Sequence, residues 1–365
     1  MEARVGSVGV LVLLTVAALL SGCAEAAGKG IPALFVFGDS TVDTGNQNYI
    51  TSVIKSNYPP YGKDFNPPGP TGRFCNGKVA NDFLADFLEI PRPVNYLAPE
   101  AKGSRVLTGV NFASSGSGYL DITGALFGVL NLTRQLDNFG IVKKEIISQI
   151  GEESTDKLLR ESIYLISTGS NDFVNSYNLN PILQAKFTPA AYETLLLGTI
   201  DTNLKTLYDY GARRVFIDSL SPLGCVPEQL VLAGSKDGSC IEKVNVPVKS
   251  FNVGLQATLA SIRQQRPDYD LSYVNVYDPL LEAITQPEKL GFKFGNTACC
   301  GEGPFKGLPC VNPISDVCDN ADDYVFWDLF HPTERTYDIL SSNIIKGSGL
   351  FVSPMNLEQM IAKKP

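Results

Sequence analysis

Histidine is almost absent from this chain of 365 residues, which contains only one, His331. A metal site built from several histidines is therefore excluded, and any chemistry that needs an imidazole has a single candidate. The chain also lacks a block of five or more like charges, and its net charge is −8 at pH 7. Nucleic-acid-binding surfaces cluster Lys and Arg, so we expect no nucleic-acid partner.

Long hydrophobic runs are confined to the N-terminus. Arg4 precedes an uncharged run over residues 5–24, which ends in small residues and an Ala-x-Ala exit at Ala26. This pattern predicts a secretory signal peptide over residues 1–26. A membrane anchor and a bacterial lipoprotein site at Cys23 are the alternatives, but the strongly apolar part is shorter than the roughly 20 residues of a membrane span. We therefore expect no stable membrane insertion after the signal is removed.

The remaining residues, 27–365, have the composition of a globular protein. The whole chain is 44% hydrophobic and 19% charged, with a mean hydropathy of +0.03, which is typical of chains with a hydrophobic core. No repeat, low-complexity linker or break in composition divides them. We expect one domain, and a monomer by default.

Seven cysteines follow the predicted signal peptide, as expected of a disulfide-bonded secreted protein. We predict a bridge between Cys225 and Cys240, because they enclose a loop containing Pro and Gly. Four more lie within residues 299–318, and their pairing is open. A zinc site there is the alternative, although it lacks a C-x2-C knuckle. Cys75 is left as a free or buried thiol, and Asn131 begins the glycosylation sequon Asn-Leu-Thr.

Short apolar runs alternate with longer amphipathic ones along the chain. The runs predict strands at residues 33–37, 110–113, 163–167, 214–218 and 272–276. The amphipathic stretches predict helices at residues 79–90, 132–150, 190–210, 244–263 and 332–345. This alternation indicates an α/β fold: a three-layer sandwich in which helices cover both faces of a five-stranded, mainly parallel, flavodoxin-like sheet.

Ligands of such sheets bind beyond the carboxyl ends of the strands. Two glycine-rich segments are poor phosphate or dinucleotide sites: residues 72–78 are followed by Val79 in place of a hydroxyl, and Asp121 replaces the third glycine after 116–118. The Gly-x-Ser-x-Gly nucleophile elbow is also absent. No cofactor or metal is therefore expected.

With these sites set aside, the residues that remain are those of a hydrolytic site. A histidine side chain has an ordinary pKa of about 6.5, so at pH 7 it can accept a proton from a serine hydroxyl. Asp328 lies three residues before His331, a spacing that lets a turn place the carboxylate against the imidazole. On its own this pair is ordinary, since a surface aspartate near a helix start gives the same spacing.

The remaining groups stand at three predicted strand ends. Ser40 follows the first strand, with Gly38 allowing a tight turn, and its ordinary alternative is a helix N-cap. Gly116 offers a backbone N–H and Asn171 a side-chain amide. Together with the N–H of Ser40, they would direct three donors at one developing oxyanion.

Four blocks of sequence, in order, resemble the plant GDSL lipases/esterases of the SGNH-hydrolase superfamily. They are residues 37–46, 109–118, 169–172 and 328–334. The resemblance implies the SGNH hydrolase fold, with Ser40 as nucleophile, His331 as general base and acid, and Asp328 as its orienting partner. Ser40, Gly116 and Asn171 would form the oxyanion hole. The chain departs from the family pattern at Gln47, Cys75, Ser115 and Ser117. Two of these, Ser115 and Ser117, are expected to crowd the oxyanion loop.

The expected function is hydrolysis of carboxylic esters through a serine acyl-enzyme, on a small-molecule, lipid or polysaccharide ester. An acyltransferase using the same residues is the first alternative, and a secreted binding or defence protein with an idle site is the second. We expect secretion to the extracellular space or cell wall, with a vacuolar route as the alternative. Residues 49–65 and 299–318 are the expected walls of the cleft.

Overall fold

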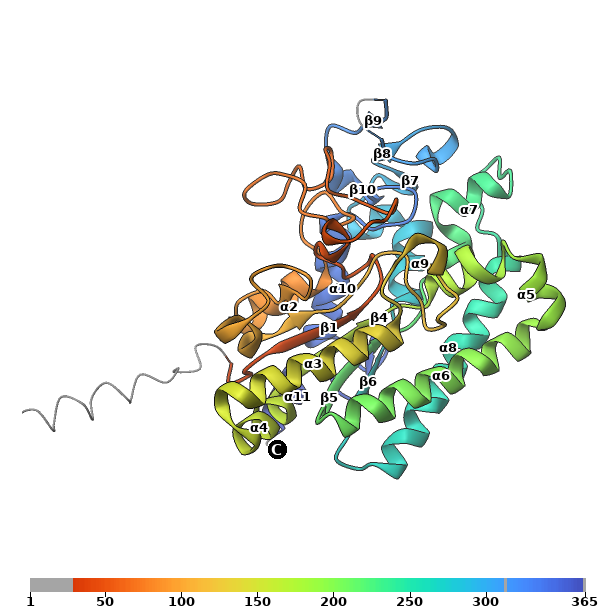
Figure 1. Cartoon of the computed structure of the whole chain (residues 1–365). Coiled ribbons are helices and arrows are strands. Elements are labelled where there is room, and N and C mark those ends of the chain that lie inside the picture. Colours follow the sequence, from red (N-terminus) through yellow and green to blue (C-terminus); the bar gives the residue numbers. More distant parts are fainter. Residues whose placement is uncertain (1–28, 312–313, 364–365) are drawn as a thin grey trace, which may run out of the picture.

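The computed structural model describes residues 29–311 and 314–363. The predicted signal peptide, residues 1–26, lies outside this range. The central sheet has the order β11-β6-β5-β4-β1-β3-β2 (Figure 1). Its strands are β1 (Leu34–Gly38), β2 (Val94–Asn95), β3 (Val110–Asn111), β4 (Ile163–Ser167), β5 (Arg214–Asp218), β6 (Asp270–Val274) and β11 (Val352–Ser353).

The five predicted strands form the body of this sheet and are parallel to one another. Numbered along the chain, they stand in the order 2-1-3-4-5 of flavodoxin-like sheets. The structure adds two edge strands of two residues each, parallel β2 and antiparallel β11. Each of these edge strands has one buried residue and no apolar run, which is why the prediction stopped at five strands.

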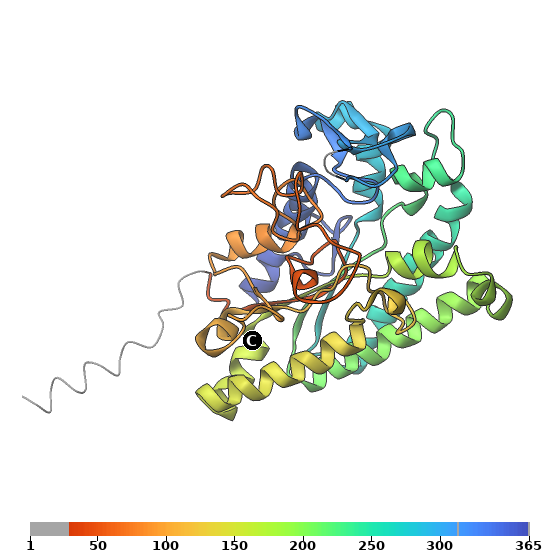
Figure 2. The ribbon, with the colours of Figure 1, turned by 45° about the horizontal axis from the view of Figure 1, so that its top comes forward.

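Helices cover both faces of the sheet (Figures 1 and 2). They are α2 (Ala80–Leu88), α3 (Leu132–Ile150), α4 (Glu152–Glu161), α5 (Pro181–Lys186), α6 (Pro189–Asp209), α7 (Pro227–Leu232), α8 (Glu242–Gln265), α9 (Tyr277–Thr285), α10 (Glu334–Lys346) and α11 (Leu357–Ala362). α3, α4, α6 and α8 pack on one face. α2, α10 and α11 pack on the other. The predicted three-layer α/β sandwich is therefore confirmed.

Alternating residues of the buried strands supply the two cores. In β1, Phe35 and Phe37 join the core under α3 and α6, whereas Leu34 and Val36 join the core under α2 and α10. All five residues of β1 are buried. A strand enclosed on both faces is apolar throughout, which explains the continuous hydrophobic runs of the sequence.

Several elements differ from the prediction. α4 was missed because Gly151, with a positive φ of 79°, ends α3 and a second helix starts at the next residue. β6 ends at Val274 rather than at residue 276, since Asn275 turns the chain into α9 and bonds Asp278 there. α10 starts at Glu334 with Thr333 as its N-cap, so Pro332 lies before the helix.

Three disulfides hold the loops at the carboxyl ends of the strands. The predicted Cys225–Cys240 bridge is confirmed, and the open pairing resolves into Cys299–Cys318 and Cys300–Cys310. The zinc alternative is wrong, because its four cysteines are consumed by the two bridges. Cys75 is unpaired and buried, as predicted.

The two bridges within residues 299–318 belong to a small disulfide module. It contains the short strands β7 (Phe294–Ala298), β8 (Cys300–Gly301), β9 (Asp316–Val317) and β10 (Tyr324–Phe326). The module packs against Tyr61 and Phe74. Of the helices in the described residues, none is long and apolar enough to cross a membrane.

Candidate active site

The candidate residues gather where β1 and β4 lie side by side. Gly38, the last residue of β1, pairs with Ser167, the last residue of β4. Ser40 and Asn171 follow these strand ends by two and four residues. The chain crosses to opposite sides of the sheet at this point, which is where flavodoxin-like sheets bind their ligands.

Gly38 is required by the closeness of the two strands. Its φ is +147°, and a Cβ built there would lie 2.0 Å from the Ser167 carbonyl oxygen. Its N–H donates to Gln135 Oε1, and its carbonyl accepts from Gln135 Nε2 and Ser117 Oγ. The turn that presents Ser40 is thus fixed on both sides by buried hydrogen bonds.

Ser40, His331 and Asp328 form a continuous hydrogen-bonded chain. Ser40 Oγ lies 2.8 Å from His331 Nε2, and His331 Nδ1 lies 2.8 and 3.0 Å from the two carboxylate oxygens of Asp328. Asp328 is fully buried, whereas Ser40 is partly exposed toward solvent. The imidazole can therefore take the Ser40 proton while the carboxylate orients the ring.

The turn between β10 and α10 fixes the Asp328–His331 pair. The Trp327 N–H donates to the His331 carbonyl at 2.7 Å, which closes the turn. Asp328 Oδ1 also accepts the N–H groups of Phe330 and His331. Burial opposes ionisation of Asp328, but His331 and these hydrogen bonds outweigh it and lower the pKa of the carboxyl below its ordinary value. The aspartate is therefore held as the anion that supports an imidazolium.

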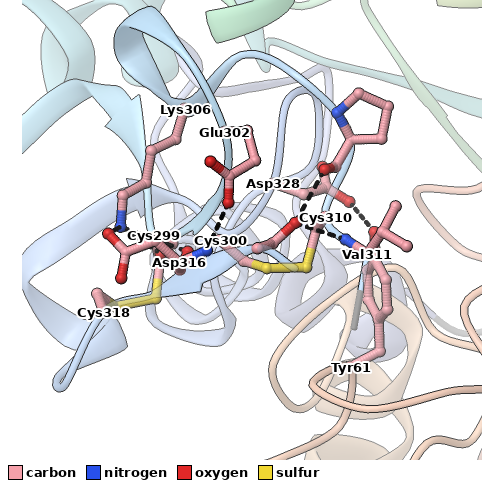
Figure 3. Close-up of a disulfide and its surroundings, with 12 residues drawn as sticks. Tyr61, Cys299, Cys300, Glu302, Lys306, Cys310, Val311, Asp316, Cys318 and Asp328 are labelled. Carbon is pink, nitrogen blue, oxygen red and sulfur yellow. Dashed lines mark hydrogen bonds and ion pairs between the residues drawn. A yellow bond between two sulfur atoms is a disulfide. The ribbon is translucent and has the colours of Figure 1, made fainter. Parts of the chain in front are cut away.

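A fourth side chain, Tyr61, was missed by the sequence reasoning. Its hydroxyl donates to Asp328 Oδ2 at 2.8 Å, and its ring is buried (Figure 3). Burial and the negative charge of Asp328 raise the pKa of Tyr61 well above its ordinary value, so the phenol remains a donor. Residues 49–65 were expected only as a cleft wall. A single tyrosine in a loop carries no periodic signal that would mark this contact.

Two backbone N–H groups of the expected oxyanion hole have no hydrogen-bond acceptor among the described residues. Within residues 29–311 and 314–363, neither the Ser40 N–H nor the Gly116 N–H makes a hydrogen bond. Asn171 Nδ2 donates to the Ser117 carbonyl at 2.9 Å, and Asn175 Nδ2 donates to Asn171 Oδ1 at 2.6 Å. Ser40, Gly116 and Asn171 line the same cleft as His331. The structure thus brings together all five residues singled out by the sequence.

The loop that carries Gly116 is rigidly held. Gly116 has a φ of +87°, and a Cβ there would lie 2.5 Å from Ile54 Cδ1. The neighbouring Ser115 and Ser117 are fully buried and donate to Asp43 Oδ2 and to the Gly38 carbonyl. Neither serine is among the residues that line the cleft. Their hydroxyl groups donate to buried acceptors, and these hydrogen bonds hold the backbone on either side of Gly116.

The cleft has a volume of about 590 Å³ and is lined mainly by apolar side chains around Ser40. Both expected walls are confirmed, since Tyr58 and Tyr61 come from residues 49–65 and Cys310 from the disulfide module. Tyr58 joins the two walls by donating to the Cys310 carbonyl at 3.1 Å. This hydrogen bond therefore ties the two walls to each other.

Comparisons with known proteins identify the family. The GDSL-like lipase/acylhydrolase family matches residues 34–344. The chain belongs to this GDSL family. A GDSL esterase/lipase of Arabidopsis thaliana is 40% identical over 324 residues, which cover 86% of this chain and 88% of that protein. A second from the same plant, GDSL esterase/lipase APG, is 38% identical over 336 residues and covers 91% and 95%. A third is 35% identical over 364 residues and covers 99% and 97%.

Three carboxyls near Ser40 are buried, and they belong to Asp39, Asp172 and Asp218. Burial raises the pKa of Asp39 and Asp172 to about 6 and that of Asp218 to about 7, although hydrogen bonds from hydroxyls partly offset the effect. Asp39 accepts from Thr41, and Asp172 accepts from Thr123 and two backbone N–H groups of the Gly116 loop. Asp172 thereby holds the backbone that follows Gly116.

Six cysteines are held in bridges, and Cys75 is the free cysteine of the described residues. In the part of the chain that the structure describes, no three His, Cys, Asp or Glu side chains gather as metal ligands.

Asn131 of the sequon is the N-cap of α3, where its Oδ1 accepts the Arg134 N–H at 2.8 Å.

Proposed function

We propose that this GDSL-family protein hydrolyses carboxylic acyl esters through a covalent intermediate on Ser40. The observation that carries the proposal is the 2.8 Å contact between Ser40 Oγ and His331 Nε2, continued to buried Asp328. His331 would accept the Ser40 proton as Oγ attacks the ester carbonyl, and would return it to the leaving alcohol. Water, activated in the same way, would then release the acid and free Ser40.

The oxyanion of each tetrahedral intermediate would be met by the N–H groups of Ser40 and Gly116 and by the Asn171 amide. Among the described residues the two backbone donors have no acceptor to give up, so they would need little reorganisation when charge develops. Tyr61 would act as a positioning residue, because its hydroxyl holds Asp328 without touching the reacting atoms.

We also propose that the protein is secreted. Three disulfides are typical of proteins that fold in an oxidising compartment. With the predicted signal peptide over residues 1–26, they support an extracellular or cell-wall location, with the vacuole as the alternative. We propose one domain over residues 27–365, with Asn131 as the glycosylation site.

The test is turnover of nitrophenyl esters, from acetyl to palmitoyl, by the chain from residue 27 produced in an oxidising compartment. Ser40→Ala, produced in the same way, is the control. Turnover that depends on Ser40 supports the proposal. Equal turnover by Ser40→Ala refutes it. Adding an alcohol acceptor and analysing the products separates hydrolysis from acyl transfer, and absence of turnover with any ester, with or without acceptor, favours a binding protein with an idle site.

A further inference from the structure

The side-chain amide of Asn171 is held at both of its ends. Asn171 Oδ1 accepts a hydrogen bond from Asn175 Nδ2 at 2.6 Å, and Asn171 Nδ2 donates to the Ser117 carbonyl at 2.9 Å. An amide nitrogen carries two N–H groups, so the bond to Ser117 leaves one of them over. Its contact with Asp39 Oδ2 is 3.4 Å long, which exceeds the usual length of about 2.9–3.0 Å. This second N–H is therefore weakly engaged, and it is the one that can meet an oxyanion.

The Asp39 carboxyl competes for this second N–H. It directly precedes Ser40, it is buried, and its Oδ2 makes no other hydrogen bond within the described residues. Burial raises the pKa of Asp39 to about 6, so the group is mainly an anion above neutral pH. Because a carboxylate is a stronger acceptor than a neutral carbonyl, an unrestrained Asn171 amide would rotate toward Asp39. The hydrogen bond from Asn175, at the other end of the amide, opposes this rotation.

A single π-helical turn, Asp172–Tyr177, carries Asn175. The start of the turn is anchored twice, since the Asp172 carboxyl accepts from Thr123 Oγ1 at 2.6 Å and its main-chain carbonyl accepts from the Tyr192 hydroxyl at 2.9 Å. Turns of this kind are rare, and many of them occur at functional sites. The backbone from which the Asn175 amide donates is therefore fixed.

We propose that Asn175 is a positioning residue, which holds the Asn171 amide so that one N–H points at the oxyanion of the ester intermediate. Asn175 is exposed at the cleft, so packing gives no reason for an amide at this position. Within the described residues, its side chain makes one hydrogen bond, the one to Asn171. The inference rests on the proposed function and adds to its oxyanion hole a residue that acts through Asn171.

The test measures steady-state turnover of nitrophenyl butyrate, above neutral pH, by two variants of Asn175. Asn175→Asp replaces the donor amide by a carboxylate of the same shape, which repels Asn171 Oδ1. We expect kcat to fall by about tenfold to a hundredfold with little change in KM, because the neutral ester binds as before and the oxyanion loses a donor. Asn175→Leu removes the hydrogen bond without adding charge, and it should lower kcat by about three- to tenfold.

Asn178→Asp is the matched control for added charge. Asn178 directly follows the π-helical turn, and its side chain neither lines the cleft nor makes a hydrogen bond within the described residues. We expect this variant to keep the kcat and KM of the parent. Thermal unfolding of all three variants should match that of the parent, because both positions lie outside the buried core.

A double-mutant cycle separates positioning from direct contact with the substrate. If Asn175 acts through Asn171, Asn175→Leu has no further effect on kcat in the Asn171→Ala protein. The inference is overturned if Asn175→Asp keeps the parental kcat, if Asn178→Asp lowers kcat equally, or if the effect of Asn175→Leu persists in Asn171→Ala. Absence of Ser40-dependent turnover in the unsubstituted protein would refute the proposed function itself, and the role of Asn175 with it.

Discussion

Replacing Tyr61 by Phe tests how the candidate triad is held. The substitution removes the hydroxyl that donates to Asp328 Oδ2 at 2.8 Å and keeps the ring, whose edge-on contacts with Tyr58, Phe74 and Trp327 have centroid distances of 5.4, 5.6 and 6.2 Å. A hydrogen bond to a charged group contributes about 1.5–3 kcal/mol. Asp328 keeps three other donor groups, so we expect only part of this energy to appear in catalysis.

The expected result is a fall in kcat/KM of about tenfold, which corresponds to about 1.4 kcal/mol. Without the phenol, the charge of Asp328 is less compensated and favours the imidazolium more strongly. The acidic limb of the pH profile of kcat/KM should therefore move to higher pH, a shift that general loosening of the fold would not produce.

Tyr58→Phe is the matched control for this experiment. It removes a neighbouring hydroxyl, which donates to the Cys310 carbonyl at 3.1 Å and not to Asp328. We expect its kcat/KM to stay within about threefold of the parent, with an unmoved acidic limb. If Tyr61→Phe kept both parental turnover and the parental pH profile, the positioning role of Tyr61 would be refuted.

Three further substitutions test the oxyanion donors, the buried carboxyls and the disulfide module. Asn171→Ala should lower kcat by about 10²–10³ with little change in KM, since it removes one donor; an unchanged kcat in steady-state assays would remove Asn171 from the hole. Burial raises the pKa of Asp218 to about 7, so its contribution to stability is present at low pH and is lost as pH rises toward 7. Asp218→Asn should therefore gain stability relative to the parent between about pH 4 and 7, by about 1.4 kcal/mol per pH unit, and a pH-independent difference in denaturant unfolding would contradict this. Replacing Cys300 and Cys310 by Ser opens a bridge of sequence separation 10 and should cost about 2–4 kcal/mol of unfolding free energy, whereas an unchanged melting temperature would show that the bridge does not stabilise the fold.

The sequence was sufficient for the central sheet because its strands are buried on both faces. Phe35, Phe37 and their neighbours form a continuous apolar run. A strand exposed on one face would alternate apolar and polar residues instead. The candidate site followed from the same logic, since Ser40, Gly116 and Asn171 come directly after strands whose carboxyl ends meet at one edge. The order of strands, which places these ends together, follows from the fold class.

What could not be predicted depends on contacts between distant segments. Tyr61 and Asp328 are 267 positions apart, and only the folded chain brings the phenol to the carboxylate. The pairing of the four cysteines within 299–318 depends on how β8 and β9 align, and that register has no local signal.

The central claim, that Ser40 carries the acyl group, is tested most directly by covalent labelling. The protein is treated with a fluorophosphonate, which reacts with activated serines, and the modified peptide is identified by mass spectrometry. The account predicts one adduct, on Ser40, formed much more slowly in His331→Ala and absent from Ser40→Ala. An adduct on another serine, or ester turnover that survives in Ser40→Ala, would contradict it.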